Sequence, residues 1–348
     1  MNPSIEPFRV AFTGDFHDSD GNPKYRDFGL PVFQNHTQIE HHVIGEFTPE
    51  LTAEQIGTAN GVIVLTPRVT ARSLRTPDLL AIARFGVGFD SVDVDACTQA
   101  DVLLIIATGA VERSVAEAVL TWMLALSHHL QVKDRLVREG RWEARSQYMG
   151  SELRGRTLGL VGFGRIARAL VQLVGGLGIK KFLAYDPHVE PRLAWEHGVE
   201  IASLDDLLSK SDFVSIHCPL EPSTRNLIGE PQLARMQPHA FLINTARGGI
   251  VDEQALYRIL KERRIAGAAV DVFASEPPIT RHPLAELDNV LLAPHCIAWT
   301  DELFSEIGRV VCQGMLDLSH GEKPNGMVNP VVLQRPGFKD KWARWGGA

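Results

Sequence analysis

The chain has 348 residues, and its 35 Lys and Arg against 42 Asp and Glu give a formal net charge of −7. This mildly acidic, scattered charge argues against a nucleic-acid-binding protein, which usually carries a basic stripe that displaces counterions from phosphates. No apolar run approaches the roughly 18 residues of a membrane helix, and the N-terminus has no signal-peptide pattern. We therefore expect a soluble, cytoplasmic protein without a membrane or nucleic-acid partner, and its length favours two domains.

Metal binding is not expected. The four cysteines are far apart in the sequence and form no C-x-x-C pair, so neither a zinc knuckle nor a dense disulfide framework is suggested (Cys97, Cys218, Cys296 and Cys312).

Short runs rich in Val and Ile alternate with segments of helical period, which predicts an α/β protein with parallel sheets. The strands expected in the first third are 9–12, 42–44, 61–65, 80–84 and 102–106. A helix is expected over 52–59. Another should begin at Ser114, where Ser114 and Glu117 read as a capping box, and continue through 119–126.

A second and more regular series begins at Leu158, with six expected strands at 158–161, 182–185, 213–216, 241–244, 268–270 and 290–292. Six strands with intervening helices suit a doubly wound sheet. A long helix is expected over 301–318, ended by Gly321 and Pro324. The tail 338–348 is predicted to be loosely held.

A G-x-G-x-x-A motif follows the first strand of this series and opens a helix: Gly162, Gly164 and Ala167. The first glycine permits a tight turn, the second lets the backbone approach a pyrophosphate, and alanine lets helix and strand pack closely. The helix N-terminus offers free amides to the phosphates.

Asp186 lies 24 residues after Gly162, at the end of the next strand, where its carboxylate can accept both adenosine ribose hydroxyls. Since that carboxylate would repel a 2′-phosphate, the sequence favours NAD over NADP, with NADH preferred over NADPH.

Three unusual polar residues follow three later strands. Arg247 comes after 241–244, Glu276 after 268–270, and His295 after 290–292. In an open parallel sheet, ligands bind outside the carboxyl ends of the strands, so all three reach one edge. Reducing a carbonyl with a hydride requires a proton donor, and histidine titrates in the right range. Glu276 would orient the ring and favour its charged form, while the planar fork of Arg247 suits a carboxylate or carbonyl. The set predicts reduction of a 2-oxo acid.

These residues carry a family resemblance. The glycine motif with Asp186, the segment 215–220 with Thr224, and the segments 244–248, 271–277 and 294–295 resemble the D-isomer-specific 2-hydroxyacid dehydrogenases. Segments 86–90 and 115–117 extend the similarity, which covers roughly residues 60 to 330 in the family's order.

The resemblance implies two Rossmann-like or flavodoxin-like domains with a crevice between them. Residues 1–107 and 299–348 would form a discontinuous substrate domain, and 108–298 an inserted NAD-binding domain. It further implies a homodimer formed through an arm at about 120–155.

It also implies individual roles. The amides of Val87 and Gly88 would bind the substrate carboxylate. Asp271 would bind the amide group of the nicotinamide, and the carbonyl of Ala246 would face the nicotinamide ring. The other expected cofactor contacts are Arg165, Ile166, Cys218, Thr224 and Thr245. Cys218 is equally well read as a packing residue that contributes only its backbone.

Substrate choice is left open. Arg68 could bind a second anionic group of the substrate or be a solvated surface residue. Trp299 could form a wall of the substrate pocket or be a packing residue. The loop 16–34 could be a lid or an insertion. Glyoxylate and hydroxypyruvate are the first substrates to test. A phosphoglycerate-type activity also remains open, and so does phosphite oxidation. Formate oxidation is disfavoured because formate dehydrogenases of this superfamily carry glutamine at the position of Glu276. The alternative is a binding protein instead of an enzyme: a cofactor-sensing module similar to the dehydrogenase-like corepressors, which bind NAD(H) and protein partners.

Overall fold

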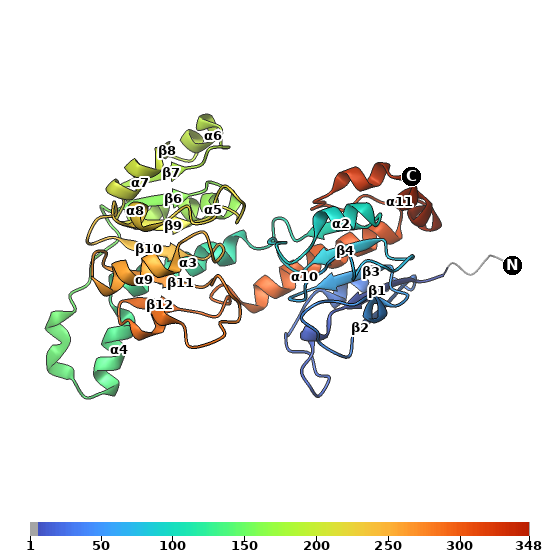
Figure 1. Cartoon of the computed structure of the whole chain (residues 1–348), viewed down its shortest axis with the longest axis horizontal. Coiled ribbons are helices and arrows are strands. Elements are labelled where there is room, and N and C mark those ends of the chain that lie inside the picture. The colour runs from blue at the N-terminus through green and yellow to red at the C-terminus, as the bar shows by residue number, and fades with distance from the viewer. Residues whose placement is uncertain (1–5, 348) are drawn as a thin grey trace. The chain divides into compact units, whose positions relative to one another are not determined.

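The computed structural model describes residues 6–347 and divides into two compact domains. The first consists of Met1–Val111 and Trp299–Ala348, and the second of Glu112–Ala298 (Figure 1). The first domain boundary, at 111/112, lies four residues after the expected position, 107/108. The second boundary, at 298/299, is at the expected position. Among the described residues, no helix is long and apolar enough to cross a membrane.

The first domain contains a parallel five-stranded sheet in the order β2-β1-β3-β4-β5. Its strands are β1 (Phe8–Phe12), β2 (Ile39–Val43), β3 (Gly61–Val64), β4 (Ala81–Arg84) and β5 (Leu103–Ile106). This is the flavodoxin-like order, in which ligands bind at the carboxyl ends of the strands. All four residues of β3 are buried, as expected for a strand covered on both faces.

The helices of this domain begin at polar caps. In α1 (Ala53–Ile56), Thr52 and Gln55 form a complete capping box, and in α2 (Val94–Gln99) the Asp93 carboxylate accepts the amide of Ala96. The predicted helix over 52–59 is thus a single turn. In α10 (Asp301–Ser319), the Thr300 hydroxyl accepts the amide of Leu303.

The loop after β1 is fixed against α10 by a close backbone contact. A Cβ added to Gly308 would lie 2.1 Å from the carbonyl carbon of Phe28, so only glycine fits there. Gly29, with φ of 96°, makes the reciprocal contact with the backbone of Gly308. Asp27 adds hydrogen bonds from the Gly29 amide (2.9 Å) and the Ser305 hydroxyl (2.7 Å). This part of the 16–34 loop is therefore a packed element of the first domain.

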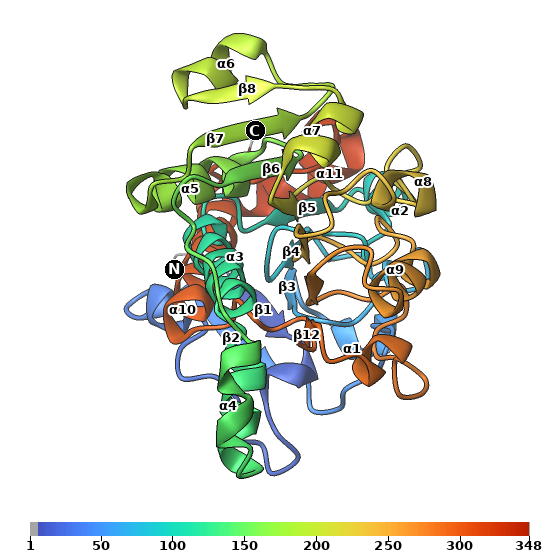
Figure 2. The ribbon, with the colours of Figure 1, turned by 90° about the vertical axis from the view of Figure 1, so that its left-hand side faces the viewer.

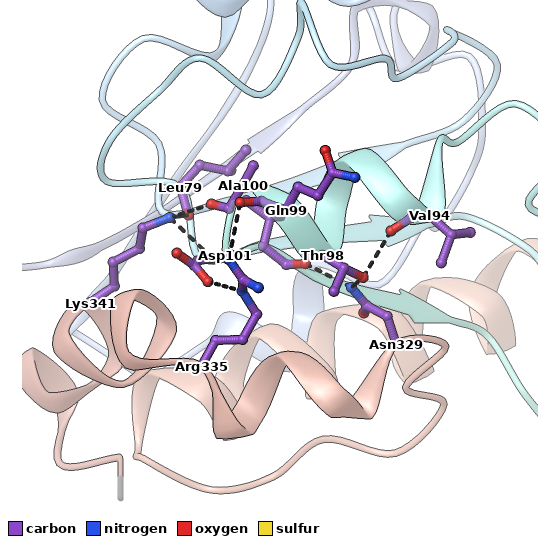
Figure 3. Close-up of polar contacts among 10 residues, drawn as sticks. Leu79, Val94, Thr98, Gln99, Ala100, Asp101, Asn329, Arg335 and Lys341 are labelled. Carbon is purple, nitrogen blue, oxygen red and sulfur yellow. Dashed lines mark hydrogen bonds and ion pairs between the residues drawn. The ribbon is translucent and has the colours of Figure 1, made fainter.

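The expectation of a loosely held tail is wrong for the described residues. Helix α11 (Pro336–Trp342) packs on the first domain, and the Trp342 side chain is 1% exposed, with its indole N–H donating to the Leu318 carbonyl. The Lys341 ammonium donates to the carbonyls of Leu79, Ala100 and Asp101 at 3.0–3.1 Å (Figure 3). Arg335 pairs with Asp101 beside it. The basic, Trp-containing composition of the tail serves this docking.

The second domain contains a parallel seven-stranded sheet in the order β12-β11-β10-β9-β6-β7-β8 (Figure 1). Figure 2 shows the strands β6, β7 and β8 at one side of this sheet. Its strands are β6 (Thr157–Val161), β7 (Lys181–Tyr185), β8 (Val199–Ile201), β9 (Phe213–Ile216), β10 (Phe241–Asn244), β11 (Gly267–Val270) and β12 (Val290–Leu292). The strand order reverses between β6 and β9, which is the doubly wound arrangement. The prediction of six strands is wrong by one, because the short edge strand β8 has only three residues and gives little alternation.

The helices of the second domain are α3 (Glu112–Ser127), α4 (Leu130–Arg138), α5 (Arg165–Val174), α6 (Pro191–Glu196), α7 (Leu204–Lys210), α8 (Glu230–Leu233) and α9 (Glu253–Lys261). The predicted capping box at Ser114 is wrong, because α3 begins at Glu112 and Ser114 lies inside it. Glu117 instead pairs with Arg113, one turn earlier on the helix surface.

Candidate active site

The carboxyl ends of the central strands of the second sheet lie level with one another. Val161 pairs with Ile216, Asn244 with both Ile216 and Val270, and Val270 with Leu292. Because the strands are parallel and in register, the loops after β6, β9, β10, β11 and β12 leave from the same edge. This register explains why residues far apart in sequence belong to one candidate site.

The loop between β6 and α5 is shaped to receive a phosphate group. Gly162 has a φ of 94°, and a Cβ on it would lie 2.6 Å from the amide nitrogen of Cys218 in the loop after β9. A Cβ on Gly164 would meet no atom within 4 Å, so the backbone is open there. Gly164 is also the N-cap of α5 and offers no side-chain capping hydrogen bond. The first amides of the ten-residue helix thus retain their capacity to bind an anion.

Asp186 is held at the end of β7 by backbone amides. Its carboxylate accepts hydrogen bonds from Phe163 in the glycine loop and from His188, both at 2.8 Å. The acidic group is therefore attached to the phosphate-binding loop, where a ribose hydroxyl beside the pyrophosphate would reach it.

Cys218 and Thr224 shape the loop after β9. Burial raises the pKa of the Cys218 thiol to about 11, so the thiol is neutral at physiological pH. The Thr224 hydroxyl donates to the Pro219 carbonyl (2.6 Å) and accepts the Glu221 amide (2.8 Å), which closes a local turn. Next to Cys218, burial lowers the pKa of His217 to about 4, and its ring is neutral. His217 Nε2 is buried and makes no hydrogen bond with the described residues.

After β10, the Thr245 hydroxyl is buried and has no hydrogen-bond partner among the described residues. Such an orphaned group in a protein interior is uncommon and is expected to find a partner in a ligand or in water. Together, the open Gly164 backbone, the uncapped α5 N-terminus, Asp186 and Thr245 fit a dinucleotide.

His295 and Glu276 form the chemical centre of this edge. His295 Nδ1 lies 2.6 Å from Glu276 Oε2, and Nε2 makes no hydrogen bond with the described residues. The Glu276 carboxylate also accepts the Phe273 amide at 2.8 Å. Burial, the largest single influence, raises the pKa of Glu276, but the hydrogen bonds from His295 and Phe273 and the nearby Arg247 charge outweigh it and lower the pKa. The Glu276 carboxylate is therefore an anion at neutral pH that contacts Nδ1, and Nε2 lies on the opposite side of the ring from this contact.

Asp271 holds the histidine loop in place. Its carboxylate accepts the amides of Cys296 (2.9 Å) and Ile297 (3.2 Å), and its carbonyl accepts the amide of His295 (2.8 Å). His295 has a φ of 53°, which is uncommon for a residue with a side chain and depends on such support. Burial raises the pKa of Asp271, while the two amides oppose this shift. In this structure Asp271 acts as a cap of the turn that presents His295.

Arg247 follows β10 and folds back toward its own backbone. Its Nη1 donates to the carbonyl of Ala246 at 2.6 Å, and its charge contributes to lowering the pKa of Glu276. The structure thus brings Arg247, Glu276, Asp271 and His295 together at one edge of the second sheet.

Val87 and Gly88 lie at the carboxyl edge of the first sheet, after β4. The Phe85 amide bonds to Val64, and the Gly86 carbonyl accepts the amide of Ala107. The amides of Val87 and Gly88 donate to no group within residues 6–347. A Cβ on Gly86 would lie 2.4 Å from Nη1 of Arg84, so a guanidinium packs against this loop. Sequence reasoning missed Arg84 because it read this residue only as a strand end.

The two residues left open by the sequence have different surroundings. Arg68 is exposed, and its backbone pairs with that of Glu50. Hydrogen bonds from Thr70 and Arg72 lower the pKa of Glu50, and the charge of Arg68 adds to this shift. Trp299 is 47% exposed and packs against Tyr25 and Phe304. Sequence reasoning also missed Tyr25, which lies in a loop without periodicity.

Comparisons with known proteins identify the family of this chain. Residues 120–296 match the model of the "D-isomer specific 2-hydroxyacid dehydrogenase, NAD binding domain". The chain is 38% identical over 284 residues to a glyoxylate reductase of Korarchaeum cryptofilum, covering 80% of this chain and 85% of that one. It is 36% identical over 311 residues to a D-3-phosphoglycerate dehydrogenase of Methanocaldococcus jannaschii. That alignment covers 88% of this chain but only 58% of the M. jannaschii protein.

The fold is shared with solved structures. The TT0316 protein of Thermus thermophilus superposes with a TM-score of 0.80 at 29% identity, covering 92% of this chain and 99% of that one. Both predicted sheets, the α/β class and the family resemblance are confirmed. The chain belongs to the D-isomer-specific 2-hydroxyacid dehydrogenase family and is an NAD-dependent oxidoreductase that interconverts 2-hydroxy acids and 2-oxo acids.

Proposed function

We propose that the protein reduces a small 2-oxo acid to the D-2-hydroxy acid with His295 as the proton donor. The observation that carries this proposal is the 2.6 Å contact between His295 Nδ1 and Glu276, which leaves Nε2 directed away from its carboxylate partner. The carbonyl oxygen of the substrate takes the proton from Nε2 as its carbon accepts a hydride. In the reverse direction, neutral Nε2 accepts the hydroxyl proton. Glu276 orients the ring and stabilises its charged form.

NADH, when bound, supplies the hydride. Its pyrophosphate would be held by the backbone at Gly162, Gly164, Arg165 and Ile166, and its adenosine ribose by Asp186. The loops with Cys218, Thr224, Thr245 and Ala246 would line the remainder of the site. Asp271 is proposed to reach the nicotinamide amide through the carboxylate oxygen that does not cap the histidine turn.

The substrate carboxylate is assigned to the amides of Val87 and Gly88, and Arg247 to the carboxylate or carbonyl oxygen. Two adjacent amides without partners form an anion-binding concavity, and the Arg84 guanidinium adds positive charge to it. For Arg247 to bind a ligand, its guanidinium would turn away from the Ala246 carbonyl that Nη1 contacts in this structure.

NADH is proposed as the preferred cofactor over NADPH. The Asp186 carboxylate already accepts two amides, so it is fixed at the β7 end with its negative charge. A 2′-phosphate placed beside it would meet a like charge at close range.

A steady-state assay tests the function. NADH and NADPH oxidation would be followed with glyoxylate, hydroxypyruvate, pyruvate, 2-oxobutyrate, phenylpyruvate and 2-oxoglutarate, and the product configuration determined. Turnover with NADH to a D-hydroxy acid is expected. Tight NADH binding without turnover of any acid would contradict the proposal and favour the cofactor-sensing module.

We also infer that the protein is a homodimer formed through the arm at 120–155. Helix α4 extends away from the sheet in Figure 1, and the arm exposes large apolar side chains. These are Leu124 at 40%, Leu130 at 60%, Val137 at 62%, Trp142 at 59% and Met149 at 79%. Such a grouping of exposed apolar residues indicates a protein interface. Sedimentation equilibrium should show a dimer, and Leu130→Glu combined with Trp142→Glu should yield a monomer.

A further inference from the structure

A group of aromatic side chains forms a surface at the carboxyl edge of the first sheet. Tyr25 stacks on Phe304 with ring centroids 4.2 Å apart, and Trp299 meets both rings edge-on, at 5.9 Å from Tyr25 and 5.0 Å from Phe304. We call Tyr25, Trp299 and Phe304 the aromatic wall. Phe304 also contacts Phe85, at 5.5 Å, and Phe85 directly precedes the loop with Val87 and Gly88. The wall therefore adjoins the proposed carboxylate-binding amides within one domain.

The wall is rigidly supported. Phe16 lies behind it, 5.0 Å from Phe85 and 6.2 Å from Tyr25, and is fully buried. The backbone contact between Gly308 and Phe28 anchors the loop that carries Tyr25 to the same helix that carries Phe304. A surface held on two sides in this way can discriminate between ligands by shape, because its side chains cannot yield without disturbing the core.

The exposure of the wall is concentrated on Trp299. Its side chain is 47% exposed, Tyr25 is partly buried, and Phe304 is 5% exposed. A rigid, exposed indole beside a phenol presents an apolar surface with little flexibility, which suits contact with a flat or branched apolar group.

The charges around the wall disfavour a second anion. Burial, and then the negative charge of Asp15, raise the pKa of the Tyr25 phenol, so a carboxylate lies near this ring. Asp15 is itself buried and accepts hydrogen bonds from the Thr13 hydroxyl (2.6 Å) and the Thr66 amide (2.9 Å). Arg26 is 84% exposed on its side chain and lies 3.6 Å from Asp301. The cation packed against the 86–88 loop, Arg84, serves the carboxylate that every 2-oxo acid carries.

We propose that the aromatic wall contacts the substituent at C3 of the 2-oxo acid and selects substrates whose substituent is apolar and uncharged. This inference rests on the proposed function. Within the first domain, Phe85 contacts Phe304 of the wall and directly precedes the loop with Val87 and Gly88. An acid whose carboxylate binds those amides would therefore hold its substituent on the side of the wall. A second anionic group, as in 2-oxoglutarate or phosphohydroxypyruvate, would lie against aromatic rings, and the nearby Arg26 is already paired with Asp301.

The test compares kcat/KM with NADH for glyoxylate, 2-oxobutyrate, phenylpyruvate, 2-oxoglutarate and phosphohydroxypyruvate. Glyoxylate has no substituent to reach the wall, so it is the internal reference. The unaltered protein should favour phenylpyruvate and 2-oxobutyrate over both acids that carry a second anionic group. Trp299→Ala should lower the phenylpyruvate-to-glyoxylate ratio by about tenfold, the effect expected for loss of an aromatic contact in a pocket. Tyr25→Ala should lower it less, and Trp299→Phe should retain most of it.

Two further variants separate recognition from folding. Trp299→Arg places a cation on the wall and should shift the preference toward 2-oxoglutarate. Trp195→Ala, which removes a tryptophan that is 77% exposed in the second domain, should leave every ratio unchanged. The proposal is overturned if the unaltered protein prefers a dianionic acid, or if Trp299→Ala and Tyr25→Ala lower the rates for glyoxylate and phenylpyruvate in parallel.

A binding measurement keeps this proposal distinct from the proposed function. If no acid is reduced, the assignment of catalysis fails. Calorimetric titration of phenylpyruvate and of 2-oxoglutarate, in the presence of NADH, then tests the wall alone. Tighter binding of phenylpyruvate that is lost in Trp299→Ala would support it, and equal affinities in both proteins would overturn it.

Discussion

The carboxyl edges of the two sheets carry different chemistry. At the edge of the second sheet the proposed functional groups are ionisable side chains, each joined to another group by a defined hydrogen bond: Asp186, Arg247, Glu276 and His295. At the edge of the first sheet they are backbone amides at Val87 and Gly88, together with aromatic rings.

This difference follows from what each task requires. Proton transfer and cofactor binding need charges at fixed positions, and a charge removed from water is stable only when it is paired or hydrogen-bonded. Recognition of a small acid needs shape and a single anion site, which glycine-rich backbone and rigid aromatic rings provide at low electrostatic cost. Substitutions at the second edge should therefore alter kcat and its pH dependence, and substitutions at the first should alter selectivity.

The largest effect is expected for His295→Ala. Loss of the proton donor should lower kcat by about 10² to 10⁴-fold, the range for general acid–base catalysis. NADH affinity, measured by fluorescence titration, should remain close to that of the unaltered protein. Unchanged turnover would remove His295 from the mechanism.

Arg247→Lys should lower kcat/KM by about 10- to 100-fold, comparable with the loss of one hydrogen bond to a charged group. The charge is retained but the planar fork is lost, so the defect should be present at every substrate tested. Rates close to those of the unaltered protein would show that Arg247 does not contact substrate.

Glu276→Gln should narrow the pH range of reduction. In the folded protein the pKa of Glu276 is lowered, so its carboxylate supports the histidine at neutral pH and loses this role only as the pH falls through that lowered value. Glutamine cannot stabilise an imidazolium by charge, so the rate of reduction should begin to fall at a lower pH than in the unaltered protein. A kcat profile from pH 5 to 9 measures this, and superimposable profiles would contradict the pairing.

Asp186→Ala should relax cofactor choice by roughly tenfold in the ratio of kcat/KM for NADPH to NADH, since one close like-charge contact is removed. His188→Ala, a neighbouring exposed residue, serves as the control. A variant that still rejects NADPH would place discrimination elsewhere.

The smallest effect on turnover is expected for Lys341→Met, which lies outside both edges. The variant should destabilise the first domain by about 1–3 kcal/mol, because three carbonyls lose their shared ammonium donor. Urea unfolding measures this change, while kcat should be unaffected below the transition. Unchanged stability would mean that the α11 contacts of Trp342 alone hold the tail.

Several features were beyond sequence reasoning for identifiable reasons. Strand β8 has only three residues, too few to show the alternation of apolar and polar residues typical of a strand. Ser114 and Glu117 have the spacing of a capping box, but α3 begins two residues earlier, at Glu112. The tail appeared weakly apolar in sequence, yet Trp342 and Lys341 find their partners in Leu318, Leu79 and Asp101, which lie at least 24 residues away along the chain.

The sequence by itself determined the α/β class, the glycine loop, the acidic residue after β7, and the order of arginine, glutamate and histidine at successive strand ends. These depend on local periodicity and on the rule that parallel strands deliver their following loops to one edge. Only the tertiary structure decided that Glu276 meets His295 at 2.6 Å, that Asp271 caps the histidine turn, and that Tyr25 stacks on Phe304. Each of these contacts joins residues separated by 19 or more positions, and such pairings are decided by packing of the whole domain and not by local propensity.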